Sequence, residues 1–159
     1  SRNAFQNMIE PSFPFELEHL IEFYAEDIDF ELENEDEIVN WLKEILVAEN
    51  KELDTITYIF CSDAYLLTIN QTYLKHEDYT DIITFPYNRN PIEGDVFISI
   101  ERAQENAAQF NVTMTDEIHR LFVHGLLHLI GYDDKDSDSK KRMTELEDHY
   151  LSKRSFVVA

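Results

Sequence analysis

Two histidines four residues apart could carry chemistry in this chain of 159 residues. His124 and His128 stand in the run His-Gly-Leu-Leu-His-Leu-Ile-Gly-Tyr-Asp-Asp, which extends from position 124 to 134. Residues four apart on an α-helix differ by only about 40 degrees in azimuth, so both imidazoles would project from one face and could bind one metal ion. The pair alone is weak evidence, because helical histidines at this spacing also occur on polar surfaces and in core hydrogen bonds.

The residues after the pair suggest a third ligand. Gly131 is expected to adopt the left-handed conformation that often ends a helix, and a chain that reverses there can bring Asp134 back beside the last helical turn. Three protein ligands with a fourth position left open are typical of catalytic zinc, because the cation acidifies a water in that position. The sequence therefore predicts one zinc ion per chain, bound by His124, His128 and Asp134 at the end of a central helix.

The charge balance limits how this chain could bind nucleic acid. There are 33 acidic residues and 13 basic ones, which gives a net charge of −20 at neutral pH. Binding to nucleic acid usually depends on a basic face that releases counterions from phosphates. Any action on RNA must therefore depend on a local patch, on the metal, or on a partner that presents the substrate. A simpler interpretation is that the acidic surface only maintains solubility.

Length and composition predict one soluble globular domain. Hydrophobic residues make up 43% of the chain, which favours a single hydrophobic core over disorder. No apolar stretch is long enough to span a membrane, and no secretion signal is recognisable. The lone Cys61 cannot form an internal disulfide, which fits a reducing compartment. We expect a cytoplasmic protein without a membrane partner, in which residues 1–15 are an extension or expression remnant and residues 16–159 form the domain.

Hydrophobic periodicity predicts the elements that must position the site. Strands are predicted at 20–25, 55–61, 81–87 and 95–100, and helices at about 35–50, 63–74, 101–110, 113–130 and 139–153. Thr113 and Asp116 are a capping-box signal for the helix that carries the histidines. Seven acids without a base in 27–37 indicate a solvated loop, and the turn-rich residues 88–94 could join a hairpin. The predicted fold class is α+β, with about four strands in a mixed sheet and about five helices.

These segments are similar to those of the YbeY family of bacterial ribosomal-RNA maturation endoribonucleases. The run from His124 to Asp133 resembles the family signature His-Gly-x-Leu-His-Leu-x-Gly-Tyr-Asp. The segments Ile69–Tyr73, Thr80–Pro86 and Gly94–Ser99 resemble further family blocks, so the similarity extends over roughly residues 20 to 153. It implies a zinc-dependent, single-strand-specific endoribonuclease that acts in 3′-end maturation of 16S rRNA and in ribosome quality control. The implied partners are ribosomal RNA, the small ribosomal subunit and ribosomal proteins, but not DNA.

One departure from the family concerns the third ligand. The family has a histidine directly after the aspartate of its signature, where this chain has Asp134. A carboxylate in place of a neutral imidazole lowers the net charge of a zinc site by one unit, so the water bound to the metal becomes less acidic. The harder oxygen ligand also makes Mn or Fe more plausible than at a three-histidine site. Zinc remains the expected metal. Asp133 matches the family aspartate and is expected to orient the turn or a liganding histidine through a hydrogen bond.

A second departure lies at Leu74, where the family usually has an arginine that could bind a phosphate through two N–H groups. Leucine cannot do so. Lys75 or His76 could supply a point charge or a protonatable donor instead, and we name them as the side-chain candidates for catalysis. The simpler interpretation is that both are ordinary loop residues.

Two other metal-binding functions are weaker alternatives. Helical zinc peptidases place a glutamate directly after the first histidine, where this chain has Gly125. Acids at positions 134, 136, 138 and 145 have the spacing of calcium ligands in an EF-hand loop. However, Ser139 stands where that loop needs glycine, and the three basic residues 140–142 would repel a cation.

A ribosome-associated factor with a mainly structural metal is the remaining alternative. The acidic surface and the leucine at position 74 favour it, whereas the open coordination position of a three-ligand site opposes it. Activity on naked RNA compared with activity on ribosomal particles would separate the two functions.

Overall fold

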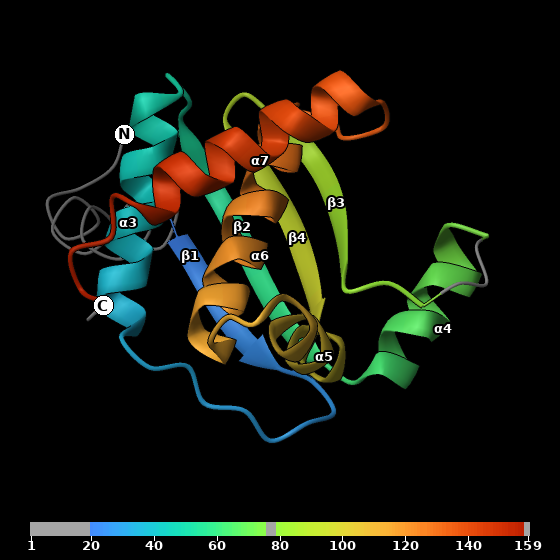
Figure 1. Ribbon diagram of the computed structural model, residues 1–159. Coiled ribbons are helices and arrows are strands. Elements are labelled where there is room, and N and C mark those ends of the chain that lie inside the picture. The colour runs from blue at the N-terminus through green and yellow to red at the C-terminus, as the bar shows by residue number, and fades with distance from the viewer. Residues whose placement is uncertain (1–19, 76–78, 158–159) are drawn as a thin grey trace, which may run out of the picture.

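A computed structural model describes residues 20–75 and 79–157 of the protein (Figure 1). The extension predicted at 1–15 and the candidate His76 lie outside the described residues. The strands are β1 (Leu20–Ala25), β2 (Leu53–Cys61), β3 (Ile82–Arg89) and β4 (Ile92–Ser99), and the helices are α3 (Glu35–Ala48), α4 (Asp63–Tyr73), α5 (Ile100–Phe110), α6 (Met114–Ile130) and α7 (Ser137–Leu151). The predicted α+β class is confirmed.

The four strands form one mixed sheet in the order β1-β2-β4-β3. β1 and β4 both run parallel to β2, whereas β3 is antiparallel to β4. The predicted β3–β4 hairpin is confirmed, but its turn is shorter than the predicted 88–94. Arg89 already pairs with Ile92, after a register shift between Pro86 and Asn88. Turn-type residues are tolerated here because β3 is an edge strand and its last residues are exposed.

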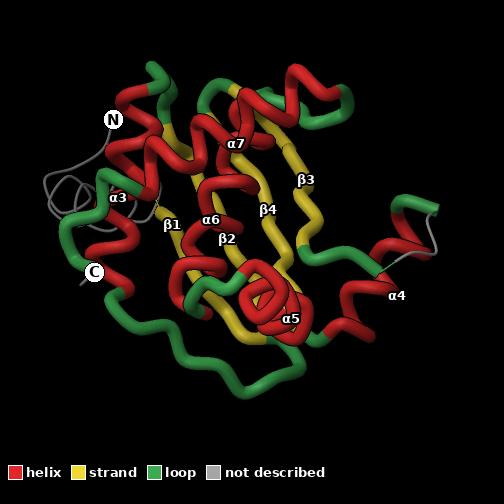
Figure 2. Tube along the Cα trace, in the orientation of Figure 1, coloured by secondary structure: helices red, strands yellow, loops and turns green. Residues whose placement is uncertain are grey.

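Helices α3, α6 and α7 lie over one face of the sheet, which holds the larger core, whereas α4 lies toward the edge of the molecule (Figures 1 and 2) and packs against a smaller cluster on the other face. Alternate residues of a strand point to opposite faces. Accordingly, Val96 and Ile98 of β4 contribute to the large core under α3, α6 and α7, whereas the intervening Phe97 packs against the smaller cluster that contains Leu66 and Ile69 of α4. The helix that carries the histidines therefore lies in the larger layer, across the middle of the sheet.

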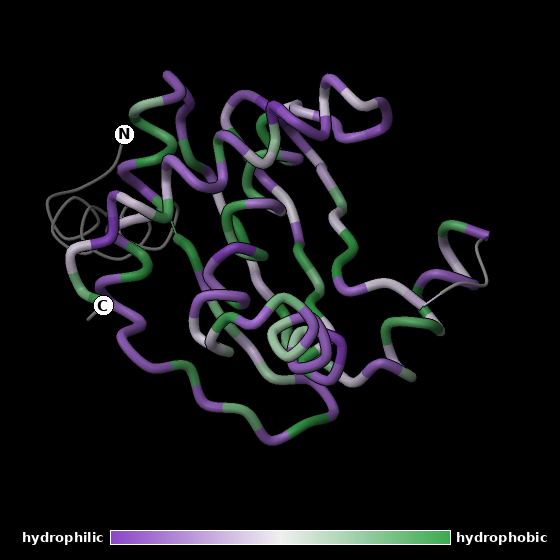
Figure 3. Tube along the Cα trace, viewed as in Figure 1, coloured by the Kyte–Doolittle hydropathy of each residue, from purple (hydrophilic) through white to green (hydrophobic). Residues whose placement is uncertain are grey.

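The acidic segment between β1 and α3 is only partly solvated. Hydrophilic and hydrophobic residues alternate along it (Figure 3), and Ile28, Phe30 and Leu32 pack against the large core while the acids between them remain exposed. Alternation of this kind allows an extended segment to lie on a core while its charges remain in water. The predicted loop is confirmed, but it is anchored at every second residue.

Two glycines allow α6 to lie unusually close to the sheet. A Cβ atom on Gly125 of α6 would stand 2.7 Å from Val96 Cγ1, and one on Gly94 of β4 would stand 2.5 Å from Leu129 Cδ2. Val96 is a stiff side chain, so Gly125 is required by the approach of the helix to the strand, and Gly94 is further restricted by the backbone oxygen of Phe85, 2.9 Å from its added Cβ. The cost of about 1 kcal/mol for glycine within a helix is thereby explained by packing.

Candidate metal site

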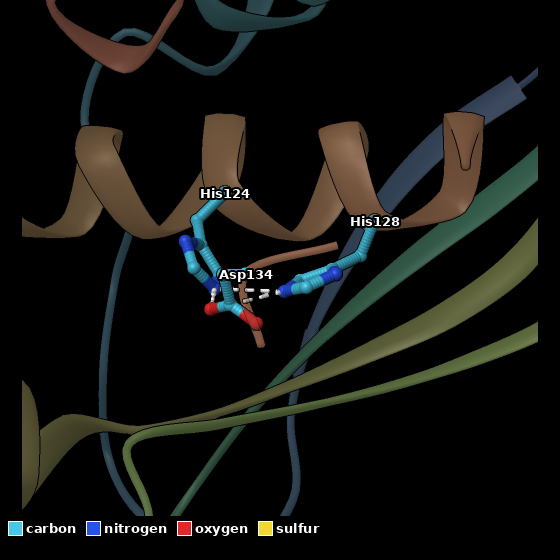
Figure 4. Close-up of side chains that lie close together, drawn as sticks. All are labelled: His124, His128 and Asp134. Atoms are coloured by element: carbon cyan, nitrogen blue, oxygen red, sulfur yellow. Dashed lines mark hydrogen bonds and ion pairs between the residues drawn. The ribbon is translucent and has the colours of Figure 1, made fainter. Parts of the chain in front are cut away.

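The three predicted ligands meet at the C-terminal half of α6. The Nε2 atoms of His124 and His128 lie 3.0 Å apart. The Oδ2 atom of Asp134 lies 3.4 Å from the first of these nitrogens and 3.6 Å from the second. Figure 4 shows both imidazoles on the same side of the helix, directed toward the carboxylate. All three side chains are only partly buried, so the cluster is accessible from outside.

The end of α6 determines where Asp134 lies. Gly131 has φ 125°, in the region that favours glycine, and reverses the chain as predicted. The N–H groups of Gly131 and Tyr132 both donate to the carbonyl of Leu127, at 3.1 and 3.0 Å. The Arg89 guanidinium, from the end of β3, donates to two further carbonyls of the last turn at 3.1 and 2.9 Å. These bonds satisfy carbonyls that a helix end leaves free, and they hold the turn that returns Asp134 to the histidines.

Hydrogen bonds from behind orient each imidazole. His124 Nδ1 lies 2.7 Å from Glu147 Oε2, and His128 Nδ1 lies 3.0 Å from the carbonyl oxygen of Tyr132. An ionised carboxylate and a backbone carbonyl can only accept, so each Nδ1 carries a proton and donates it. The Nε2 lone pairs of both rings consequently face the centre of the cluster, which is the tautomer that a metal-binding histidine needs.

The donor set fits a small divalent cation. Three electron-rich atoms that converge within 3.0 to 3.6 Å repel one another unless a positive charge lies between them. Bonds of about 2.0–2.1 Å from nitrogen or oxygen to tetrahedral zinc would separate the donors by roughly 3.3 Å. The three observed separations bracket that value, so His124, His128 and Asp134 could bind zinc with little rearrangement.

Charges around the cluster act differently on the two histidines. Burial lowers the pKa of His124, but the hydrogen bond and charge of Glu147, with the charges of Asp134 and Asp81, raise it above its ordinary value overall. Burial, followed by the positive charge of His124, keeps the pKa of His128 below its ordinary value. A proton on His124 therefore competes with a metal ion for the centre of the cluster.

Glu147 is the principal site residue that the sequence analysis missed. Its side chain is only 8% exposed, and its second oxygen, Oε1, accepts a hydrogen bond of 2.7 Å from Arg120. The same guanidinium donates to Asp148 Oδ1 at 2.6 Å. Met143, Glu147 and Tyr150 are the buried residues of α7. The one sequence signal for Glu147 was its position as an acid among the apolar residues on the buried face of this helix. That signal did not reveal which histidine the acid would contact.

Of the other predicted site residues, Asp133 and Lys75 lie within the described part of the chain, and neither is hydrogen-bonded or ion-paired to the three ligands. The carboxylate of Asp133 accepts a hydrogen bond of 3.4 Å from the backbone N–H of Lys135, so it supports the turn. Leu74 caps α4 and is 39% exposed, and Lys75 follows it with φ 60°. Figure 1 shows this end of α4 at the edge of the molecule, well away from α6.

The structure excludes the calcium-binding alternative. α7 begins at Ser137, so residues 134–145 do not form the long ligand loop of an EF-hand. Instead, Asp136 caps the helix: its carboxylate accepts from the Ser139 N–H at 2.8 Å, and the Ser139 hydroxyl accepts from the Asp136 N–H at 3.1 Å. This reciprocal capping gives Asp136 a structural role at the start of α7.

A groove of about 880 Å³ leads away from the cluster between α5, α6 and α7. His124, Asp134 and Glu147 line it, and so do Phe110, at the end of α5, and Val112, in the turn that follows. A space of this size can accept a substrate much larger than a water molecule. The described helices include none that is long and apolar enough to cross a membrane.

Three metal donors converge beside an open groove on a mixed sheet. This arrangement is typical of hydrolases that use a single metal ion. The family model described as Endoribonuclease YbeY matches residues 20–155 of the chain. The chain is 46% identical over 141 residues to the Endoribonuclease YbeY of Cytophaga hutchinsonii, covering 87% of this chain and 99% of that protein. It is 45% identical over 126 residues to that of Flavobacterium psychrophilum, covering 79% and 90%.

The chain therefore belongs to the YbeY family, and the resemblance recognised in its signature is confirmed. Among solved structures, the solution structure of TM1509 from Thermotoga maritima has a TM-score of 0.57 at 24% identity, covering 84% of this chain and 87% of that one. That likeness supports the fold alone.

Proposed function

We propose that this protein is a metal-dependent endoribonuclease that cleaves single-stranded ribosomal RNA, with His124, His128 and Asp134 as the ligands of one metal ion. The observation that carries the proposal is the convergence of three metal donors within 3.6 Å at the edge of a groove, in a chain of the YbeY endoribonuclease family. By analogy with that family, we infer a role in 3′-end maturation of 16S rRNA and in ribosome quality control.

The protein side chains prepare the site for hydrolysis. A divalent cation bound there would supply an acidified water and stabilise charge on a phosphate. Glu147 and the Tyr132 carbonyl hold the imidazoles of His124 and His128 with their Nε2 lone pairs toward the centre. Asp134 adds the only negative charge among the three ligands, which reduces the net charge of the site. We propose zinc as the metal and regard Mn or Fe as better tolerated here than at a three-histidine site.

The charge of the chain bears on the form of the substrate. With a net charge of −20, the protein should repel free RNA at low salt. We therefore propose that the physiological substrate is ribosomal RNA presented by the small ribosomal subunit, with ribosomal proteins as contacts, in the cytoplasm. We further propose that residues 16–159 fold as one domain around this site.

Metal analysis and RNA cleavage test the proposal together. Protein purified without a chelator or histidine tag should contain about one equivalent of zinc, and His128→Ala should contain almost none. Wild type should cleave single-stranded RNA in a metal-dependent manner, with faster cleavage of 16S rRNA precursors in ribosomal particles, and His128→Ala should not. Equal metal content in both proteins would refute the ligand assignment, and cleavage unaffected by chelator would refute the metal-dependent mechanism.

One observation favours a second candidate, a ribosome-associated factor with a mainly structural metal. Leu74 stands where the family usually has an arginine, so a phosphate-binding cation is missing there. For such a factor, metal removal would lower the melting temperature and ribosome binding, while the metal-loaded protein would cleave neither naked RNA nor RNA in particles. Cleavage of either substrate that is lost in His128→Ala would exclude it.

A further inference from the structure

An exposed apolar patch lies in the same groove as the candidate metal site. Phe110, the last residue of α5, is 60% exposed, and Val112 in the following turn is 44% exposed. Both line the groove that also contains His124 and Asp134. A phenylalanine that remains exposed beside a catalytic groove has a face available for a flat, apolar ligand.

The patch is presented by a rigid turn. Asn111 has φ 56° and ends α5, and its N–H donates to the carbonyl of Ala108 at 3.4 Å. The N–H of Val112 donates to the carbonyl of Ala107 at 3.0 Å. Thr113 then caps α6 directly, so the backbone on both sides of Val112 is held by helix ends. A side chain on such a turn can bind a ligand without first ordering a loop.

The spacing suits a substrate that reaches the metal ligands from this patch. Asp116 and His124 both line the groove and are eight positions apart on α6, which corresponds to about 12 Å along the helix axis. Figure 1 shows α5 beside the first turns of α6, while α7 crosses its later turns. The groove therefore follows α6 for at least this length, which a short stretch of polynucleotide can span.

The charges in the groove disfavour binding through phosphates. Three of the described cations line it, and two of them are paired within the protein: Arg120 with Glu147 and Asp148, and Arg154 with Asp116. An RNA strand would find few free cations here, so counterion release can contribute little. Stacking of a base on an aromatic ring needs no charge and tolerates any base.

We propose that Phe110, flanked by Val112, forms a nucleobase subsite that stacks one unpaired base of the RNA whose cleaved phosphate lies at His124, His128 and Asp134. The inference rests on the proposed endoribonuclease function and adds a physical source for single-strand preference. A base within a duplex is already stacked and paired, and it must be extruded before it can lie on Phe110. The subsite therefore selects unpaired RNA without reading its sequence.

Binding of a single-stranded oligoribonucleotide that carries one 2-aminopurine tests the subsite. Stacking quenches the fluorescence of this base, and titration yields the affinity of wild type, Phe110→Ala and Phe110→Trp. Phe110→Ala should weaken binding by about 5- to 150-fold and abolish the quenching, because a base stacked on an aromatic ring contributes that much. Phe110→Trp should retain both. Tyr24→Ala is the matched control, since Tyr24 is 53% exposed on β1 and does not line the groove.

Cleavage measured in parallel separates this inference from the proposed function. The subsite is supported if Phe110→Ala raises KM for single-stranded RNA more than it lowers kcat and reduces the preference over duplex. Unchanged affinity and quenching in Phe110→Ala, with cleavage intact, would refute the subsite and leave the function standing. Loss of a concentration-dependent dimer in Phe110→Ala, with RNA affinity unchanged, would assign the patch to a second copy of the chain and overturn the inference. Base binding without any metal-dependent cleavage by wild type would instead refute the function alone.

Discussion

Replacement of Glu147 by glutamine should weaken metal binding. Glu147 does not contact the Nε2 atom of His124 that would bind the metal; it contacts the Nδ1 atom on the other side of the ring. In the native protein one oxygen accepts from His124 Nδ1 at 2.7 Å and the other accepts from Arg120 at 2.7 Å. Both partners are donors. A glutamine has one oxygen and one NH₂ group, so in Glu147→Gln one of the two donors must face another donor.

The magnitude follows from which contact is lost. If His124 loses its acceptor, its ring is free to rotate and is a weaker base, and changes of this kind typically reduce metal affinity by about 10- to 100-fold. If Arg120 loses its acceptor instead, a partly exposed ion pair is broken, which costs about 1 kcal/mol because Arg120 is 34% exposed. We expect the variant to share these costs, with both a weaker metal site and a lower stability.

Competition titrations with a chromophoric chelator would measure the zinc affinity, and urea unfolding in the presence of chelator would measure the stability of the metal-free protein. Asp148→Asn is the matched control, because Asp148 contacts the same Arg120 guanidinium at 2.6 Å and does not contact a histidine. Its zinc affinity should remain within about 3-fold of wild type. Wild-type zinc affinity in Glu147→Gln, or an equal loss in Asp148→Asn, would refute the role assigned to the His124 contact.

Three further predictions concern the ligands, the helix packing and the pH dependence. Asp134→Ala should lose nearly all bound metal. Asp133→Ala removes only a turn contact and should lose less metal affinity than Glu147→Gln. Metal titrations that rank the two aspartates in the opposite order would shift the ligand assignment by one residue. Gly125→Ala should destabilise the protein by about 1–3 kcal/mol in urea unfolding, because the added Cβ would stand 2.7 Å from Val96 Cγ1. This cost should exceed the gain from the better helix propensity of alanine. A variant as stable as wild type, or more stable, would contradict the close approach of α6 to the sheet. His119 is 3% exposed, and burial, followed by the charge of Arg154, lowers its pKa to about 4. As the pH falls, His119 therefore becomes protonated near pH 6.5 in the unfolded chain but only near pH 4 in the folded protein. About 3 kcal/mol of folding stability that is present above pH 6.5 should consequently be lost as the pH falls toward 4. His119→Gln should flatten this part of the stability curve, and parallel curves for variant and wild type would refute the assignment.

Short-range features of the candidate site were predictable from the sequence. The spacing of His124 and His128 places both rings on one helix face wherever the helix packs, and Gly131 specifies the reversal that returns Asp134. The strands and helices were predicted for the same reason, since hydrophobic periodicity is a property of neighbouring residues. The limits of the β3–β4 turn were wrong, because residues 88–89 pair as part of an exposed strand end that local composition does not distinguish from a loop.

Long-range contacts were decided only by tertiary structure. Glu147 is 23 residues from His124, and whether its carboxylate meets the ring depends on how α7 crosses α6. The packing of α5 beside α6 brings Phe110 into the groove that the candidate metal ligands also line, and α4, which Leu74 ends, lies at the edge of the molecule (Figure 1). Periodicity determines which face of a helix is buried, but not the position and angle at which two helices pack, because these depend on the side chains of both surfaces together. The sequence by itself therefore determined the three donors that could bind a metal, and the tertiary structure determined the residues that orient the donors and the groove that leads to them.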